Sequence, residues 1–159
     1  MVQQVAALDE KRRFRSAARD TAWAMSQENV ELVRAMNEAF DEGDIEGALA
    51  KLHPEVEWHG TKGGLDDGRV VRGHREVIAG FVEAFEAWER QSLETTDYFD
   101  AGDRVVVFFH EVAKGRESGA VVETDTGVIF TVKDGSVVRV HPYMDRDEAL
   151  EAAGLDAAR

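Results

Sequence analysis

The segment 53–60, HPEVEWHG, places two histidines and two glutamates within eight residues, a composition that could bind a metal ion or transfer protons. Alternation with a period of two puts Val56 and Trp58 on one face of an extended strand, and the two glutamates and His59 on the other. We expect the apolar face to pack on the core and the polar face to meet water. A metal site there would need another ligand and shelter from solvent. We therefore interpret the segment as a strand and predict no metal site.

The composition suits one cytoplasmic domain. The chain has 159 residues, no cysteine, and a net charge of −13, which argues against binding to nucleic acid. It has neither the run of about 20 apolar residues that a membrane helix needs nor the apolar core of a secretory signal. It also lacks a phosphate loop, a nucleophile elbow and a cofactor fingerprint, so we predict no cofactor.

Residues 1–24 differ from the rest of the chain. They carry five basic and three acidic residues, a charge of +2, which leaves −15 for the remainder. A second methionine, Met25, follows. We predict a flexible tail over 1–24 and a domain over 25–159. A basic arm that binds a partner, an additional helix, and translation starting at Met25 are the alternatives.

The periodicity predicts helices that precede a series of hairpin-linked strands. Ser26 is the expected cap of the first helix, Asp44 of the second and Asp145 of the last. This order implies an α+β domain with helices on one face of an antiparallel sheet. The predicted helices are 27–42, 45–52, 74–89 and 146–153, the predicted strands are 53–60, 93–99, 104–113, 120–133 and 136–144, and residues 60–73 are predicted to be a loop.

Three strings, VELVRAMNEAFDEGDIEGALAKLHPEVEW, RGHREVIAGFVEAF and VKDGSVVRVHPYMD, followed by EALEAAGL, resemble the SnoaL-like, nuclear transport factor 2-like superfamily over residues 25–155. The resemblance implies a cone-shaped, curved antiparallel sheet with helices packed on its concave face. It also implies an apolar pocket and a homodimer through the sheet. The family includes ketosteroid isomerases, polyketide cyclases, limonene epoxide hydrolase and scytalone dehydratase, so the fold alone does not give the function.

The ketosteroid isomerases can be compared residue by residue. Trp58 stands where they have the aspartate base, and Met36 stands where they have the oxyanion-hole tyrosine. Their second aspartate falls at Gly127 or Val128. None of these side chains can transfer a proton or donate the required hydrogen bond, so steroid isomerisation by that apparatus is not expected.

Strand parity predicts which side chains line the pocket, although a one-residue bulge would reverse any strand. His110 is the only titratable group on the inward lists. It is our candidate catalytic residue, with ligand contact or a structural hydrogen bond to Thr124 or Thr126 as alternatives. We expect Glu123, Asp125, His141 and Tyr143 to face outward. The inward sets are Val106, Phe108, His110 and Val112, then Thr124, Thr126, Val128, Phe130 and Val132, then Val138, Val140, Pro142 and Met144. The predicted ligand-binding residues are Met36, Phe40, Trp58, Phe108, His110, Thr126, Val128, Phe130, Val140 and Met144.

These residues favour a protein that binds a small apolar molecule in a mainly apolar pocket without catalysing a reaction. One alternative is a cofactor-independent acid–base enzyme of the isomerase, cyclase, dehydratase or hydrolase type acting on a small apolar substrate. The other is a protein-interaction module that uses the sheet face or the basic arm. We expect no nucleic-acid or membrane partner.

Overall fold

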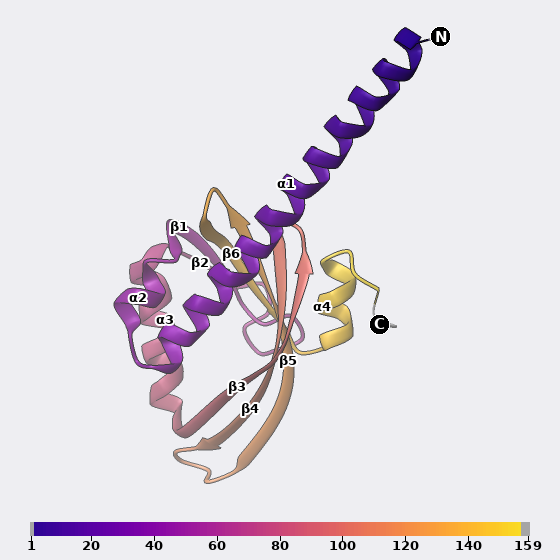
Figure 1. Cartoon of the computed structure of the whole chain (residues 1–159). Coiled ribbons are helices and arrows are strands. Elements are labelled where there is room, and N and C mark those ends of the chain that lie inside the picture. The colour runs from indigo at the N-terminus through magenta and orange to yellow at the C-terminus, as the bar shows by residue number, and fades with distance from the viewer. Residues whose placement is uncertain (1, 157–159) are drawn as a thin grey trace.

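The chain folds into one six-stranded sheet with helices on both of its faces (Figure 1). This computed structural model describes the backbone of residues 2–156 and the side chains of residues 13 and 21–156. The helices are α1 (Val2–Asp41), α2 (Ile45–Leu49), α3 (Gly73–Ala87) and α4 (Arg146–Ala152). The strands are β1 (Leu52–His59), β2 (Val70–Arg72), β3 (Trp88–Ala101), β4 (Arg104–Gly115), β5 (Val121–Lys133) and β6 (Ser136–Tyr143).

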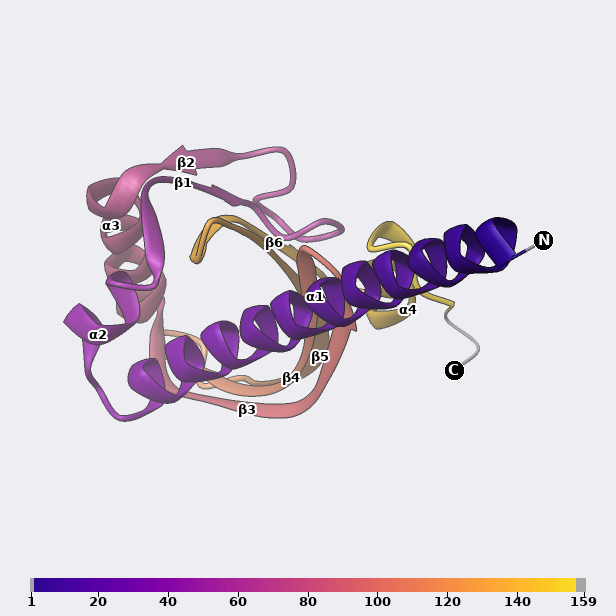
Figure 2. The ribbon, with the colours of Figure 1, turned by 45° about the horizontal axis from the view of Figure 1, so that its top comes forward.

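The strands lie in the order β2-β1-β6-β5-β4-β3, and the sheet is strongly curved but not closed (Figure 2). The α+β class predicted from the sequence is confirmed. The sheet is mixed, however, because β1 runs parallel to β6 while all other neighbours are antiparallel. The predicted loop over 60–73 also contains β2, which pairs with the end of β1.

We call the sheet face that packs against α1 and α3 the inner face, and the face that packs against α4 the outer face. The inner core joins Val33 of α1 and Val77 of α3 to side chains of β1, β4, β5 and β6. The outer core joins Ala149 and Leu150 of α4 to Val106 and Ile129. Both faces of the central strands are therefore buried, whereas the sequence predicted helices on the concave face alone.

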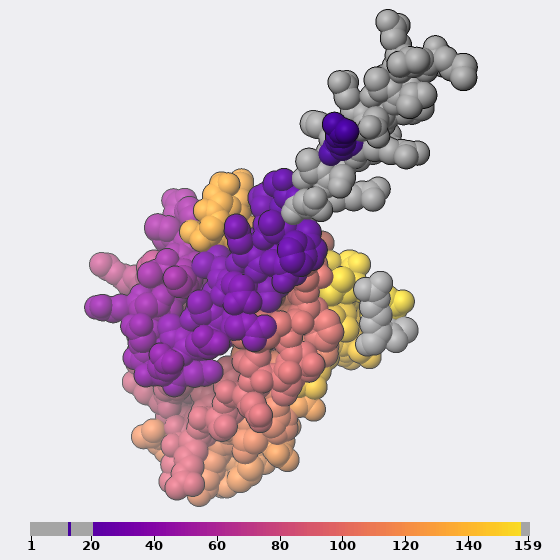
Figure 3. All heavy atoms as spheres, in the orientation of Figure 1, coloured from indigo at the N-terminus to yellow at the C-terminus, as the bar shows by residue number. Residues whose placement is uncertain are grey.

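Helix α1 is longer than predicted. It is continuous from Val2 to Asp41, so the helix start predicted after Ser26 is wrong. Ser26 lies inside the helix, where its hydroxyl donates to the carbonyl of Ala22 at 3.2 Å. The division at Met25 into a tail and a domain stays a prediction, and most side chains of residues 1–24 lie outside those described. On the surface, the described part of α1 lies beside β3 (Figure 3).

The two other predicted caps are confirmed. Asp44 accepts a hydrogen bond from the backbone of Gly47 at 2.9 Å, and Asp145 accepts one from the backbone of Glu148 at 3.1 Å. Each carboxylate occupies an N–H group that the first turn of its helix leaves without a partner. No helix in the described part of the chain is both long enough and apolar enough to cross a membrane.

Candidate functional site

The pairing of β4 with β5 shows which side chains of β4 lie on the inner face, toward α1 and α3. Val105, Val107 and Phe109 belong to the inner core, whereas Val106 belongs to the outer core and Phe108 packs against it. Directly paired residues share a face, so the predicted inward set of Val106, Phe108, His110 and Val112 is wrong by one residue. The correct inner-face series continues from Phe109 to Glu111 and Ala113.

The predicted parity is correct for most of the other strands. Val128, Phe130 and Val132 of β5 belong to the inner core, and so does Val140 of β6. A register shift between Thr131 and Val132 puts Val137 in that core instead of the predicted Val138. The predicted ligand-binding residues on the inner side are therefore Met36, Phe40, Trp58, Thr126, Val128, Phe130 and Val140. Phe108 and His110 lie on the outer face, and Met144 is 43% exposed beyond the end of β6.

The inner face is sealed over its core and is exposed farther along on the flanking strands β3 and β5. Val105 and Val107 are 0% exposed, but Leu93 and Val122, which lie on the same face farther along the sheet, are 38% and 44% exposed. Phe85, near the end of α3, is 47% exposed. We call this region the open inner face; it comprises Leu93, Thr95, Glu111, Val122, Thr124 and Thr126 of the sheet and Phe85 of α3.

A chain of aromatic rings leads from the sealed core to this region. Phe81 of α3 lies edge-on to Trp58 of β1 at 5.0 Å between ring centroids and 5.6 Å from Phe40 of α1. Phe85 follows Phe81 at 6.3 Å. Such contacts favour flat apolar partners. Trp58 lies on the inner face, as the sequence predicted.

Glu111 is the inner-face carboxylate that the sequence analysis missed. It pairs with Leu93 on one side and Thr124 on the other, and Gln91 Nε2 donates to its Oε1 at 3.0 Å. Correct parity on β4 is the only signal that would have identified it. Within the part of the chain that the structure describes, Glu111 places a proton acceptor on a largely apolar surface.

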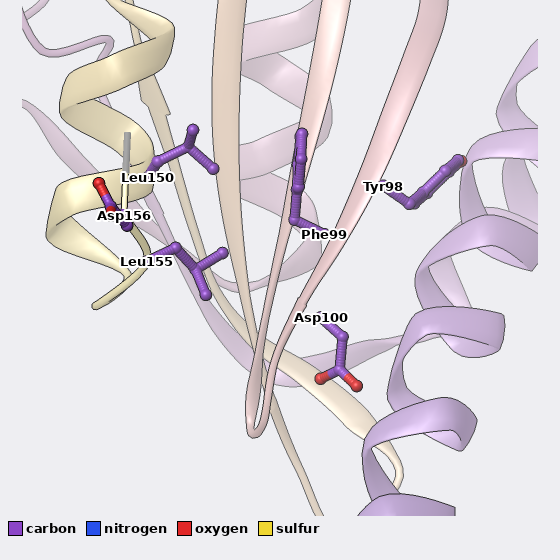
Figure 4. A pocket seen from close by; sticks show the side chains of 6 residues that line it. All are labelled: Tyr98, Phe99, Asp100, Leu150, Leu155 and Asp156. Atoms are coloured by element: carbon purple, nitrogen blue, oxygen red, sulfur yellow. The ribbon is translucent and has the colours of Figure 1, made fainter. Parts of the chain in front are cut away.

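Two hollows lie at the edge strand β3. The first, of about 250 Å³, lies between α1 and β3, and Thr95 joins it to the open inner face; we call it the α1–β3 groove. The second, of about 230 Å³, lies between β3 and the C-terminal segment, where Leu150, Leu155 and Phe99 point toward one another (Figure 4). Small-molecule sites usually have volumes of about 300–1,000 Å³. The large pocket predicted inside the cone therefore stays a prediction.

His110 lies in an ionic network on the outer face. Its Nδ1 is 2.7 Å from Asp125 Oδ1, its Nε2 is 3.4 Å from Glu123, and Arg146 is 3.4 Å from the same Asp125 oxygen. The hydrogen bond to Asp125 raises the pKa of His110, and the same bond lowers the pKa of Asp125. An imidazole between two carboxylates holds its proton more firmly, which makes it a weaker acceptor near neutral pH. The catalytic role of His110 stays a prediction, now for a different face of the sheet.

His59 and His141 form a second polar cluster, on the outer face of β1 and β6. Their rings stack at 4.8 Å, and His59 Nε2 is buried without a hydrogen-bond partner among the described residues. Burial lowers the pKa of both imidazoles, with further contributions from Arg139. Arg72 and Arg139 bind the neighbouring Glu57 at 3.3 and 3.7 Å. The described residues contain no group of three or more histidine, aspartate or glutamate side chains that could hold a metal ion.

Comparison with protein families gives one match. Residues 33–140 match the model of the SnoaL-like domain, which covers the end of α1 and nearly the whole sheet. No curated protein matches the chain.

Solved structures give the same result. An NTF2-like (nuclear transport factor 2-like) protein of unknown function from Burkholderia pseudomallei is 26% identical, with a TM-score of 0.65, over 78% of this chain and 95% of that one. TerC, co-crystallized with polyporic acid, is 27% identical, with a TM-score of 0.65, over 80% and 98%. A protein described as a candidate polyketide cyclase from Xanthomonas campestris is 26% identical, with a TM-score of 0.58, over 81% and 98%.

Proposed function

The chain belongs to the SnoaL-like domain family, and we propose that it binds a small, mainly apolar organic molecule on the open inner face. One observation carries the proposal. On this face of the sheet, exposure rises from 0% at Val105 and Val107 of β4 to 38% at Leu93 of β3 and 44% at Val122 of β5. On the central strand β4 this half stays covered, with Phe109 6% and Ala113 2% exposed, so the exposed apolar groups lie on the flanking strands β3 and β5.

The physical argument concerns exposed apolar surface. Each Å² of such surface removed from water contributes about 25 cal/mol, so an apolar ligand gains free energy by covering it. Phe85 at the end of α3, whose ring lies 6.3 Å from that of Phe81, is also about half exposed and adds an aromatic side chain from a second element. Exposed apolar surface beside polar groups is typical of binding sites.

The relatives support the proposal. TerC was crystallized with polyporic acid, so a protein that is 27% identical to this chain was prepared with a small organic acid. The aromatic rings of Phe40, Trp58, Phe81 and Phe85 give this chain a surface suited to flat rings. The hydroxyl groups of Thr95, Thr124 and Thr126 would orient polar atoms of the ligand.

A neutral fluorescent probe, N-phenyl-1-naphthylamine, tests the proposal directly. We expect saturable binding, and we expect Phe85→Ala to weaken it several-fold because the variant removes part of the apolar surface. Ile45→Ala is the matched control, since Ile45 on α2 is 46% exposed, close to the 47% of Phe85, but lies on another element. No saturable binding, or equal loss in both variants, would contradict the proposal. Polyporic acid serves as a competitor.

A second function, acid–base catalysis without a cofactor, is favoured by Glu111. The carboxylate lies on the open inner face, where it would meet the bound molecule, and Gln91 fixes one of its oxygens. The relative from Xanthomonas campestris, described as a candidate polyketide cyclase, supports the same chemistry. If the protein converts a bound molecule, Glu111→Gln should abolish that turnover, and Glu123→Gln on the outer face should preserve it. This result would establish the catalytic role of Glu111. Turnover unaffected by Glu111→Gln would exclude this role.

We also propose a homodimer through the sheet and a cytoplasmic location. The family resemblance supports the dimer, and the acidic, cysteine-free composition is compatible with the location. Light scattering after size exclusion tests the first, and a mass of one chain at micromolar concentration would contradict it.

A further inference from the structure

Tyr98 and Asn37 meet inside the α1–β3 groove. The Tyr98 ring extends from β3 toward α1 (Figure 4), and Asn37 Nδ2 donates a hydrogen bond to the Tyr98 hydroxyl at 3.2 Å. Arg34 places its guanidinium 4.4 Å from the centre of the same ring. Helix α1 therefore holds the phenol from two sides, at a position where Tyr98 lines the groove.

The direction of this hydrogen bond decides whether the Tyr98 hydroxyl can donate its proton to a ligand. A tyrosine hydroxyl has one proton to donate and lone pairs to accept, and an amide nitrogen can only donate. Asn37 therefore fills an accepting position and leaves the Tyr98 proton available. The Tyr98 hydroxyl donates to no acceptor among the described residues, so its proton can bind an oxygen atom that enters the groove.

The charges around the groove restrict which oxygen atom fits. Glu38 and Asp41 also line it, and Arg34, the one cation among the described residues that line it, lies 3.7 Å from the carboxylate of Glu31. Two carboxylates disfavour an anionic ligand, so a neutral carbonyl oxygen fits better than a carboxylate or a phosphate. Thr95 brings a further hydroxyl to the groove and connects it to the apolar open inner face.

We propose that the Tyr98 hydroxyl, held by Asn37, donates a hydrogen bond to a neutral carbonyl oxygen of the bound molecule, so that the site selects ring ketones over the corresponding hydrocarbons. The proposal rests on the proposed function and refines it. The rings would cover the open inner face, while the carbonyl group would point into the groove. Tyr98 is the specificity-determining residue, and Asn37 is a positioning residue that sets the direction of the Tyr98 proton.

Two neutral probes that differ at one carbon atom test this. α-Tetralone carries a carbonyl group where tetralin has a methylene group, and both can be measured by displacement of N-phenyl-1-naphthylamine. We expect wild-type protein to prefer the ketone. Tyr98→Phe should weaken the binding of α-tetralone by up to about tenfold, the usual effect of losing one hydrogen bond, and leave the affinity for tetralin unchanged. Tyr143→Phe is the matched control, because Tyr143 is the only other tyrosine and packs under α4 on the outer face.

A second variant tests the direction of the proton. In Asn37→Asp the new carboxylate accepts the Tyr98 proton, so the preference for the ketone should disappear although Tyr98 is intact. Equal affinities for the two probes in wild-type protein would overturn the inference and leave the proposed function standing. Equal weakening of both probes by Tyr98→Phe would also overturn it, because it would indicate a structural role. Failure of the fluorescent probe to bind wild-type protein would instead refute the proposed function, and this inference with it.

Discussion

Helix α4 approaches the outer face of the sheet at Gly127, where there is no room for a side chain. A Cβ atom at this position would lie 2.8 Å from Ala149 Cβ, 3.4 Å from Arg146 Cα and 3.5 Å from Phe108 Cε1. Carbon atoms in contact prefer separations of about 3.5–4.0 Å. Gly127→Ala should therefore push α4 away from β5 by roughly 1 Å, the shortfall between those separations and the available distance.

The expected loss of stability follows from two opposing terms. Overpacking of this size costs about 1–3 kcal/mol, and replacing glycine in a strand returns roughly 0.5–1 kcal/mol of backbone entropy. The middle values of these two ranges, about 2 and about 0.75 kcal/mol, leave a net loss of about 1 kcal/mol. With a urea dependence of about 2 kcal/mol/M, the unfolding midpoint should fall by about 0.5 M. Equilibrium unfolding followed by circular dichroism measures this shift.

Two further variants make the prediction specific. Gly80→Ala is the control, since a Cβ at Gly80 on α3 would meet nothing within 4 Å, and there the same substitution should raise the midpoint. Ala149→Gly removes the atom that clashes, so the double variant with Gly127→Ala should lose less stability than the sum of the single variants. A neutral Gly127→Ala, or strictly additive losses, would refute the close packing of α4 on β5.

Three more outcomes follow from the structure. Burial lowers the pKa of His59 and of His141, so both should reduce the free energy of unfolding as the pH falls below about 6.5, each by at most about 1.4 kcal/mol per pH unit. Urea midpoints measured between pH 7 and pH 5 should therefore depend less on pH when both histidines are replaced by glutamine. An unchanged dependence would contradict this. Asp145→Ala should cost about 1 kcal/mol in urea unfolding, because it removes the N-cap acceptor of α4, and no loss would show that the cap is dispensable. Val107→Ala, at a fully buried position, should reduce the free energy of unfolding by about 2 kcal/mol in urea unfolding. Val122→Ala, at an exposed position, should reduce it by less than about 0.5 kcal/mol. Similar losses in the two variants would argue against the contrast in burial.

Alternation predicted the inner faces of β1 and β5 correctly, because the opposite face of each strand carries polar residues. In β1, Val56 and Trp58 alternate with glutamates and a histidine, and only one register buries the apolar pair. The same holds for β5, where Thr126 precedes the core residues Val128 and Phe130. The caps at Asp44 and Asp145 were also predictable, because each depends on residues a few positions away.

Strand β4 could not be assigned in this way, for a physical reason. Val105, Val106 and Val107 are all 0% exposed, because α1 covers one face of the sheet and α4 covers the other. A strand buried on both faces is apolar throughout, so its sequence carries no alternation. The start of α1 is a related case. Ser26 has the chemistry of a cap but also tolerates the helix interior, where its hydroxyl bonds to the preceding turn.

The corrected parity of β4 changes the chemistry available to a ligand. It moves His110 to the outer face, where two carboxylates favour the charged imidazolium, and it brings Glu111 to the inner face. A molecule on the open inner face would meet a carboxylate as the proton acceptor, with Tyr98 as a hydrogen-bond donor in the adjoining groove. Tyr98 can donate a hydrogen bond to a ketone, and Glu111 can accept a proton. In this proposal, preference for a ketone would require Tyr98, whereas catalysis would require Glu111 as well. The two single variants, Tyr98→Phe and Glu111→Gln, therefore separate a binding protein from an enzyme. A binding protein would lose its preference for the ketone in Tyr98→Phe and would show no turnover of the ketone even as wild type. An enzyme would turn the ketone over as wild type and lose that turnover in Glu111→Gln.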